Sequence, residues 1–362
     1  MTDVPGLVPL PAQPDGVPWP AGGRADDVTG GWPVGGPPAS ATAALAAALD
    51  EAFAPAGPLG PTYAVVVVHR GRLVAERYAG RLPHRGGPPE PVGPATRLRS
   101  WSMAKSVLHS VAGLAVADGL VELDTPAPVP AWADPADPRH AITLEQLLAM
   151  RDGLDFAEVY EDVPGSDVVT MLYGAGRADM AAYAASRPPA APPGTRFSYS
   201  SGTSNIISGI VARAVGPGEP YRRYLADRLF GPTGMTSAVP GFDGSGTWVA
   251  SSSVHATARD FARFGLLALR DGVWNGFRIL PEGWVDHGRR PRSVEEPSGH
   301  GFGAHWWVDG DAAGTFRASG HEGQSITVSP GADLVVVRLG RSPEEAGPAL
   351  DGWRARTVGA FA

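Results

Sequence analysis

A serine and a lysine stand three residues apart in the segment Ser102-Met103-Ala104-Lys105. If this segment begins a helix, the Ser102 hydroxyl and the Lys105 amine share one face and can meet. A serine hydroxyl is a weak nucleophile until a base takes its proton, and a lysine amine can do so only when it is neutral. Burial lowers the pKa of a lysine, and a helix N-terminus favours a developing oxyanion. The spacing therefore predicts Ser102 as a nucleophile and Lys105 as its base, the S-x-x-K arrangement.

Lys105 is the only lysine among the 30 basic residues of the chain, and the other 29 are arginine. Arginine keeps its proton, whereas lysine can give one up. A bias toward arginine explains the composition, but it does not explain why lysine is retained at this one position. The retention favours a chemical need for an amine. Two simpler readings stay open, namely a chance match to S-x-x-K and a serine that only caps a helix.

A tyrosine in the segment RFSYSSGTSN, Tyr199, is a candidate to move protons beside this pair. A phenol can relay protons if a nearby cation stabilises its phenolate, and Lys105 would supply that charge. Gly194 and Gly202 predict a turn that presents Tyr199 outward. The alternative is a tyrosine buried in the core.

The segment Ser319-Gly320-His321-Glu322-Gly323-Gln324 lies between two expected strands. Glycines such as Gly323 let a substrate approach the backbone there. The N–H groups of Gln324 and Ser102 are predicted to form an oxyanion hole, with His321 polarising the tyrosine or contacting substrate. The alternative is a surface histidine in a turn.

Composition excludes several other kinds of chemistry. The chain has 362 residues, a net charge of −7 and no cysteine. The charge argues against nucleic-acid and anionic-membrane partners, and the absence of cysteine removes thiol catalysis and disulfides. The nine histidines show no metal-binding spacing, and neither a Gly-x-Ser-x-Gly elbow nor a nucleotide-binding glycine loop occurs. We expect no metal and no cofactor, a small-molecule substrate, and a cytoplasmic location because the N-terminal segment lacks a signal-peptide pattern. A homodimer is compatible with the sequence.

Strand patterns lie at both ends of the chain and helix patterns in its middle. The Pro- and Gly-rich residues 1–38 predict an extended arm, which Trp19 and Trp32 are expected to anchor on the body. Residues 39–100 and 240–362 are predicted to form an α/β sheet domain, and residues 101–239 a helical domain that carries the nucleophile. The fold class is thus α/β (α+β): an antiparallel sheet built from both chain ends and flanked by helices, plus a mostly helical second domain. A cleft between the two is the expected site.

The expected elements follow from periodicity and turn residues. Helices are predicted at 40–54 with Ser40 as its cap, 104–116, 143–150 with Thr143 as its cap, 206–215, 221–229, 258–272 with Thr257 as its cap, and about 343–358. Strands are predicted at 64–68, 73–78, 302–308, 315–319, 325–329 and 333–339, and residues 82–94 are expected to form a loop.

The catalytic candidates, in this order and rough spacing, resemble the class C β-lactamase-like serine hydrolases. The stretches ITLEQLLAMRDGLDF, GPTGM, ATARDFARFGLL and GFGAHWW are also similar, and the resemblance covers about residues 40 to 345. Within the family the chain looks most like the branch of 6-aminohexanoate-dimer hydrolase and related carboxylesterases. The resemblance implies a β-lactamase/transpeptidase-like fold with Ser102 at the junction of two domains, acylation of Ser102, and hydrolysis of the acyl-enzyme without a cofactor.

Two departures from the family bear on the substrate. β-Lactamases of this class carry Tyr-x-Asn, and here the third residue is Ser201. They also carry Lys-Thr-Gly where this chain is expected to have His-Glu-Gly, which removes a fixed cation. Both departures favour short-chain esters or linear amides over penicillins. A β-lactamase or D-Ala-type peptidase, an acyltransferase and a catalytically silent binding protein remain the alternatives.

The segment EVYEDVPGSDVVTMLYG at 158–174 is expected to be a loop over the substrate. The resemblance makes Tyr160 a candidate lid residue, and Asp162 or Asp167 could meet a substrate ammonium group. Ser201 and Trp306 are further candidates for substrate binding. The alternative for the two aspartates is a solvated loop acid.

Overall fold

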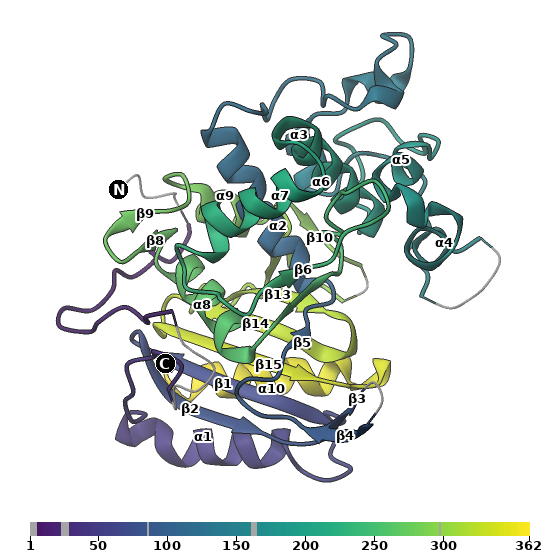
Figure 1. The fold of residues 1–362 in the computed structure, drawn as a ribbon. Coiled ribbons are helices and arrows are strands. Elements are labelled where there is room, and N and C mark those ends of the chain that lie inside the picture. The colour runs from purple at the N-terminus through teal and green to yellow at the C-terminus, as the bar shows by residue number, and fades with distance from the viewer. Residues whose placement is uncertain (1–5, 23–28, 85–86, 161–164, 297) are drawn as a thin grey trace.

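An antiparallel sheet of eight strands runs through the centre of the computed structural model (Figure 1). The structure describes residues 6–22, 29–84, 87–160, 165–296 and 298–362. The strand order is β10-β11-β12-β13-β14-β15-β1-β2, so that strands from the two ends of the chain pair side by side, as the sequence predicts. The strands are β1 (Thr62–His69), β2 (Arg72–Tyr78), β10 (Ser293–Val294), β11 (Gly301–Phe302), β12 (Trp307–Val308), β13 (Phe316–Gly320), β14 (Gln324–Ser329) and β15 (Leu334–Gly340).

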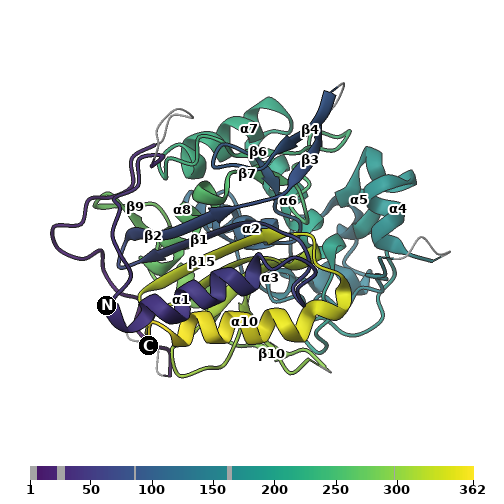
Figure 2. The same ribbon diagram turned by 90° about the horizontal axis from the view of Figure 1, so that it is seen from below.

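The central strand β1 is apolar at consecutive positions because both faces of the sheet are covered. Val65 and Val67 pack in one cluster with the helices α1 (Ala39–Ala52) and α10 (Gly347–Gly359). Figure 2 shows these two helices side by side along one face of the sheet. Val66 and Val68 point the other way, into the larger core cluster.

Two helices fill that larger core. The helix α8 (Ala258–Leu269) packs on β1, β14 and β15, and α2 (Met103–Ala117) packs on β13 and on the helical region (Figure 1). Every residue of α2 from Met103 to Ala115 is buried. A side chain on this helix is therefore held away from water whichever way it points.

The remaining elements are short. The helical region contains α3 (Leu144–Leu148), α4 (Asp167–Tyr173), α5 (Met180–Ala185), α6 (Ser201–Val215) and α7 (Glu219–Leu225), and α9 (Trp284–Arg289) packs on α2. A small sheet joins β5 (Leu98–Arg99), β7 (Val254–Ala256) and β6 (Val239–Pro240), and two hairpins pair β3 (Arg81–His84) with β4 (Gly87–Pro91) and β8 (Val273–Trp274) with β9 (Phe277–Arg278). None of the helices in the described ranges is long and apolar enough to cross a lipid bilayer.

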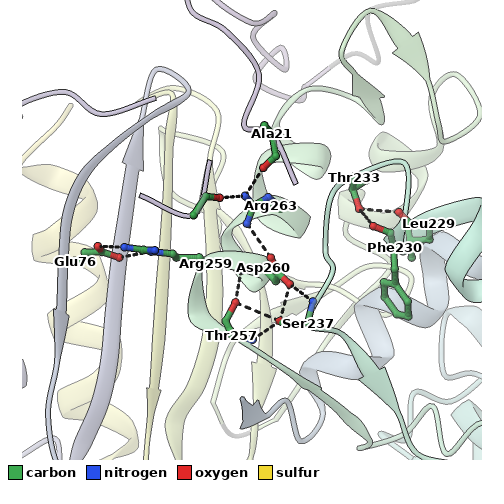
Figure 3. A network of polar contacts seen from close by, with 11 residues as sticks. Ala21, Glu76, Leu229, Phe230, Thr233, Ser237, Thr257, Arg259, Asp260 and Arg263 are labelled. Atoms are coloured by element: carbon green, nitrogen blue, oxygen red, sulfur yellow. Dashed lines mark hydrogen bonds and ion pairs between the residues drawn. The ribbon is translucent and has the colours of Figure 1, made fainter. Parts of the chain in front are cut away.

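The described part of the N-terminal arm is held on the body by buried arginines. Arg263 of α8 donates to the backbone oxygens of Ala21, at 2.6 Å, and Gly30 (Figure 3). Arg270 bonds the side chain of Gln13 at 3.0 Å. Trp32 is buried in the core, as the sequence predicts for an anchored arm.

Several element boundaries differ from the sequence prediction. The helix α1 begins at Ala39 with Pro38 as its N-cap, so Ser40 lies inside the helix and does not cap it. The expected loop at 82–94 contains most of the β3–β4 hairpin, and the expected loop at 158–174 ends in α4. The strand expected at 302–308 is two separate strands joined by a tight turn. The prolines and glycines of residues 82–94 suggested a loop, and the apolar run of residues 302–308 suggested a single strand, and both patterns gave the wrong boundary.

Candidate active site

Ser102 occupies the N-cap position of α2, at the point where the chain enters the buried helix. Among the described residues its side chain makes no capping hydrogen bond, so the hydroxyl is not used to end the helix. It instead accepts a hydrogen bond from Nζ of Lys105, one turn along, at 3.0 Å. This geometry argues against the reading of Ser102 as a simple helix cap.

Lys105 is 2% exposed, and its amine contacts three oxygens. Besides Ser102, Nζ donates to Oγ of Ser201 at 3.0 Å and to the backbone oxygen of Ser251 at 2.9 Å. Burial lowers the pKa of Lys105 to about 8, although the negative charge of Glu158 opposes the shift. An amine with this pKa is partly neutral near physiological pH and is therefore able to act as a base.

Tyr199 lies directly before α6, with its ring 4.9 Å from the Lys105 amine. Burial raises the pKa of Tyr199, the charge of Glu158 raises it further, and a hydrogen bond with Ser102 only partly opposes these effects. The phenol therefore keeps its proton at neutral pH. It is suited to donate a proton rather than to serve as a phenolate base.

Trp101 precedes Ser102 and has a left-handed backbone conformation, with φ of 46°. This conformation is strained for a bulky side chain and costs on the order of 1–3 kcal/mol, so surrounding contacts must hold it. The guanidinium carbon of Arg99 lies 3.7 Å from the centre of its ring, and the indole nitrogen donates to Glu322 at 3.3 Å. The ring of His321 packs edge-on against the indole at 5.3 Å.

Gly320, the last residue of β13, packs directly against the backbone of Ser102. A Cβ atom at Gly320 would lie 2.5 Å from the backbone oxygen of Ser100 and 3.1 Å from the backbone nitrogen of Ser102. Only glycine therefore allows the strand to approach so closely. The next residue, His321, is thereby brought to the mouth of the site.

A pocket of about 160 Å³ opens in front of Ser102. It is lined by Trp101, Ser102, Tyr160, Val168, Val169, Leu172, Tyr173, Ser201, Ser252 and His321. Tyr160 closes one side, with its ring stacked 5.5 Å from that of His321. The walls are mainly apolar and aromatic.

In the described part of the chain, no group of three or more histidine, aspartate or glutamate side chains is arranged to hold a metal ion.

Residues 55–361 match the Beta-lactamase family model, which is most of the chain. The chain belongs to the β-lactamase family. The family and the relatives described next indicate a hydrolase, and the fold is the β-lactamase/transpeptidase-like one that the sequence predicts.

Three individual proteins are similar to this member of the β-lactamase family. It is 28% identical over 304 residues to 6-aminohexanoate-dimer hydrolase of Paenarthrobacter ureafaciens, covering 78% of this chain and 73% of that protein. A solved structure from Bacillus anthracis, proposed to be a 6-aminohexanoate-dimer hydrolase, has a TM-score of 0.70 at 24% identity and covers 83% of this chain and 79% of its own. The solved structure of a penicillin-binding protein homologue from Caulobacter crescentus has a TM-score of 0.69 at 18% identity, and the match covers 91% of this chain and 97% of that chain. At these identities the two solved structures show the fold alone.

Two residues predicted to bind substrate in this β-lactamase family member are occupied elsewhere. Trp306 is 2% exposed and packs against Phe264 and Phe316 in the core, so it does not reach the pocket. Asp167 forms an ion pair with Arg187 at 2.9 Å and accepts the hydroxyl of Tyr183 at 2.7 Å. Its charge is thus already balanced within the helical region. Asp162 lies outside the described residues.

Within the His-Glu-Gly segment, His321 lines the pocket in front of Ser102, whereas Gly323 is not among the residues that line it. His321–Gly323 form a 3-10 turn beyond the end of β13, and a Cβ at Gly323 would meet Arg338, Ser342 and Leu350 instead of Ser102. Of the two glycines that flank His321 and Glu322, Gly320 therefore packs on Ser102 and Gly323 does not. The side chain of Gln324 is buried and exchanges hydrogen bonds with the backbone of Gly340.

Glu158 also belongs to the site, although the sequence patterns do not single it out. Its carboxylate accepts hydrogen bonds from the backbone N–H and the hydroxyl of Ser201, at 2.8 Å and 2.6 Å. It also accepts the hydroxyl of Tyr160 at 2.6 Å. Its place at the start of the expected lid segment, two residues before Tyr160, is the sequence signal that could have found it.

Proposed function

We propose that the protein hydrolyses short-chain carboxylic esters, and linear amides, through an acyl-enzyme on Ser102. The observation that carries the proposal is the 3.0 Å contact between Nζ of Lys105 and Oγ of Ser102 inside the buried start of α2. The lowered pKa of Lys105, about 8, supports the role of the amine as a base.

In the first half of the reaction, neutral Lys105 takes the proton of Ser102 while Oγ attacks the carbonyl carbon of the substrate. The carbonyl oxygen becomes an oxyanion. When the bond to the leaving alcohol or amine breaks, the protonated phenol of Tyr199 gives that group its proton, and Lys105 returns a proton to Tyr199. The products are a free alcohol or amine, an acylated Ser102 and a neutral lysine.

The oxyanion needs two backbone donors beside the nucleophile. The N–H of Ser102 is the first. The N–H of His321 is a better second candidate than that of Gln324, because the adjoining residue Gly320 packs on the Ser102 nitrogen and His321 lines the pocket.

In the second half, water replaces the alcohol. Neutral Lys105, assisted by Tyr199, takes a proton from a water molecule that attacks the acyl carbon. The tetrahedral species collapses, the proton returns to Oγ of Ser102, and the carboxylic acid leaves. No cofactor is required at either step.

The size and the lining of the pocket favour a substrate with a small, uncharged acyl group. Its volume of about 160 Å³ is below the usual range for drug-sized ligands, and Val168, Val169 and Leu172 supply an apolar wall. Ser201 stands where class C β-lactamases carry asparagine, which favours esters or simple amides over penicillins.

A substrate screen with mass spectrometry tests this proposal. Nitrophenyl esters of two to eight carbons, nitrocefin and aminohexanoate oligomers are offered to the purified protein and to Ser102→Ala. We expect turnover of the short esters and an acyl adduct on Ser102 that the variant lacks. Near-native turnover by Ser102→Ala would refute the nucleophile, and absence of any adduct would favour a binding protein. Ester products formed with an added alcohol would indicate acyl transfer.

A further inference from the structure

The hydrogen bonds around Lys105 have fixed directions. The backbone oxygen of Ser251, 2.9 Å from Nζ, can only accept a proton. Oγ of Ser201 and Oγ of Ser102, each 3.0 Å from Nζ, are hydroxyls that can donate or accept. What these two hydroxyls do with their single protons therefore decides where the lone pair of a neutral amine points.

The hydroxyl of Ser201 is already committed. It lies 2.6 Å from Oε1 of Glu158, a distance typical of a charge-assisted hydrogen bond from a hydroxyl to a carboxylate. The other carboxylate oxygen receives the backbone N–H of Ser201 at 2.8 Å, so both oxygens of Glu158 hold the same residue. With its proton on Glu158, the Ser201 hydroxyl can only accept from Lys105.

A neutral lysine amine has two protons and one lone pair. Ser251 and Ser201 take the two protons, and the third direction, toward Ser102, is left for the lone pair. We propose that Glu158 is a positioning residue that acts through the hydroxyl of Ser201 to direct the lone pair of neutral Lys105 at the proton of Ser102. This inference rests on the function proposed above.

A glutamine amide offers one acceptor oxygen where the carboxylate offers two, so in Glu158→Gln the N–H and the hydroxyl of Ser201 no longer both have an acceptor. The Ser201 hydroxyl can then rotate and donate to the amine. The lone pair would then be used on Ser201, and an N–H of the amine would face Ser102. In that arrangement Lys105 cannot accept the proton of the nucleophile. The loss of Glu158 therefore creates an unproductive arrangement of the base without removing any group that touches the substrate carbonyl.

The charge of Glu158 has a second effect of opposite sign. It raises the pKa of Lys105, against the effect of burial. Among the described residues, the other titratable groups near the amine are Tyr199, whose phenol stays protonated, and His305, which stays neutral because burial lowers its pKa to about 3. Glu295 acts on Tyr199 from farther along the chain. Replacing Glu158 by a neutral residue should therefore leave more amine unprotonated near pH 7.

One experiment separates the effect of Glu158 on the direction of the lone pair from its effect on the pKa of Lys105. The rate of Ser102 labelling by a fluorophosphonate and the turnover of p-nitrophenyl acetate are measured from pH 5.5 to 9.5 for the wild type, Glu158→Gln, Ser201→Ala and the double variant. The exposed Glu345→Gln, in the turn before α10, is the matched control for loss of one carboxylate. We expect Glu158→Gln to lower the plateau rate by about tenfold to a hundredfold while the acid limb moves to lower pH.

The double variant distinguishes positioning from charge. If Glu158 acts through Ser201, the double variant has the same plateau rate as Ser201→Ala, and only its acid limb moves. A plateau in Glu158→Gln equal to the wild-type plateau, or losses that multiply in the double variant, would overturn the inference. Ser201→Ala leaves Glu158 bonded to Tyr160, so an unchanged plateau in that variant would also overturn it, even if Glu158→Gln fails to fold. Wild-type protein that is not labelled at Ser102 would instead reject the proposed function, and this inference with it.

Discussion

The Cβ atom that Gly320 lacks would stand 3.1 Å from the backbone nitrogen of Ser102. The end of one strand thus presses on the residue that begins the buried helix, and the two halves of the site are fixed relative to each other. The backbone dihedral φ of Gly320 is −140°, which any residue can adopt, so the need for glycine is one of space alone.

Gly320→Ala should therefore displace Ser102, the proposed nucleophile. We expect kcat to fall by about tenfold to a hundredfold, because a small misplacement of reacting groups is costly. The free energy of unfolding should fall by about 1–3 kcal/mol from overpacking. Gly347→Ala, where a Cβ would meet no atom within 4 Å, is the control and should leave both quantities near the wild type. Wild-type kinetics in Gly320→Ala would show that the contact does not position Ser102.

Tyr199→Phe tests whether Tyr199 donates the proton to the leaving group, a role distinct from that of Lys105 as the base. A nitrophenolate leaves readily without a proton, whereas an alkoxide or an amine does not. We expect the variant to lose about 10²- to 10⁴-fold in kcat/KM for alkyl esters and amides, and much less for nitrophenyl esters. Equal losses for both kinds of leaving group, measured by product release at one pH, would argue against Tyr199 as the acid.

Val169→Phe should shorten the acyl groups that the pocket accepts. Val169 lines the pocket from α4, and a larger ring there occupies space that longer chains need. We expect kcat/KM to fall about tenfold or more for hexanoate esters and little for acetate, since each methylene contributes roughly 1–3 kcal/mol. Val239→Phe, at an exposed site of the small sheet, is the control. A uniform loss of kcat/KM for all chain lengths would indicate that the acyl group binds in another part of the cleft.

The stability of the protein should decline as the pH falls below about 6.5. Burial lowers the pKa of His305 to about 3 and that of His109 well below its ordinary value of 6.5. The unfolded chain therefore binds more protons than the folded one below pH 6.5, and the stability present above that pH is lost on acidification. Each histidine contributes about 1.4 kcal/mol per pH unit. Urea unfolding at pH 7.5, 6.5 and 5.5 measures the slope, which His109→Asn should reduce. A flat profile would contradict the buried neutral state.

The sequence predicts well the parts of the site that are local. Ser102 and Lys105 are one helical turn apart, so their types and spacing suffice to bring them together. Tyr199 is also found, because its short motif resembles a known family. The sheet, too, follows from consecutive apolar residues such as Val65 to Val68, which fit only a strand covered on both faces.

What the sequence does not reveal depends on register and on distant contacts. Trp306 and Trp307 are adjacent, and only the position of the turn between β11 and β12 decides that Trp307 contacts Tyr199 while Trp306 lies in the core. Gly320 ends β13 and Gly323 lies in the turn beyond it, and only the position of that turn decides that Gly320, and not Gly323, packs on Ser102. Glu158 meets Ser201 across 43 residues, and nothing in the local pattern marks that pair.

The pH dependence of Ser102 labelling is the direct test of whether Lys105 is the base that activates Ser102. The second-order rate of adduct formation with a fluorophosphonate is followed by mass spectrometry from pH 6 to 10. We expect a rate that rises with a midpoint near pH 8, set by the pKa of Lys105, and a loss of about 10²- to 10⁴-fold in Lys105→Arg, which keeps a cation and loses the base. Labelling of Lys105→Arg at the wild-type rate, or a wild-type rate that does not change with pH, would contradict it.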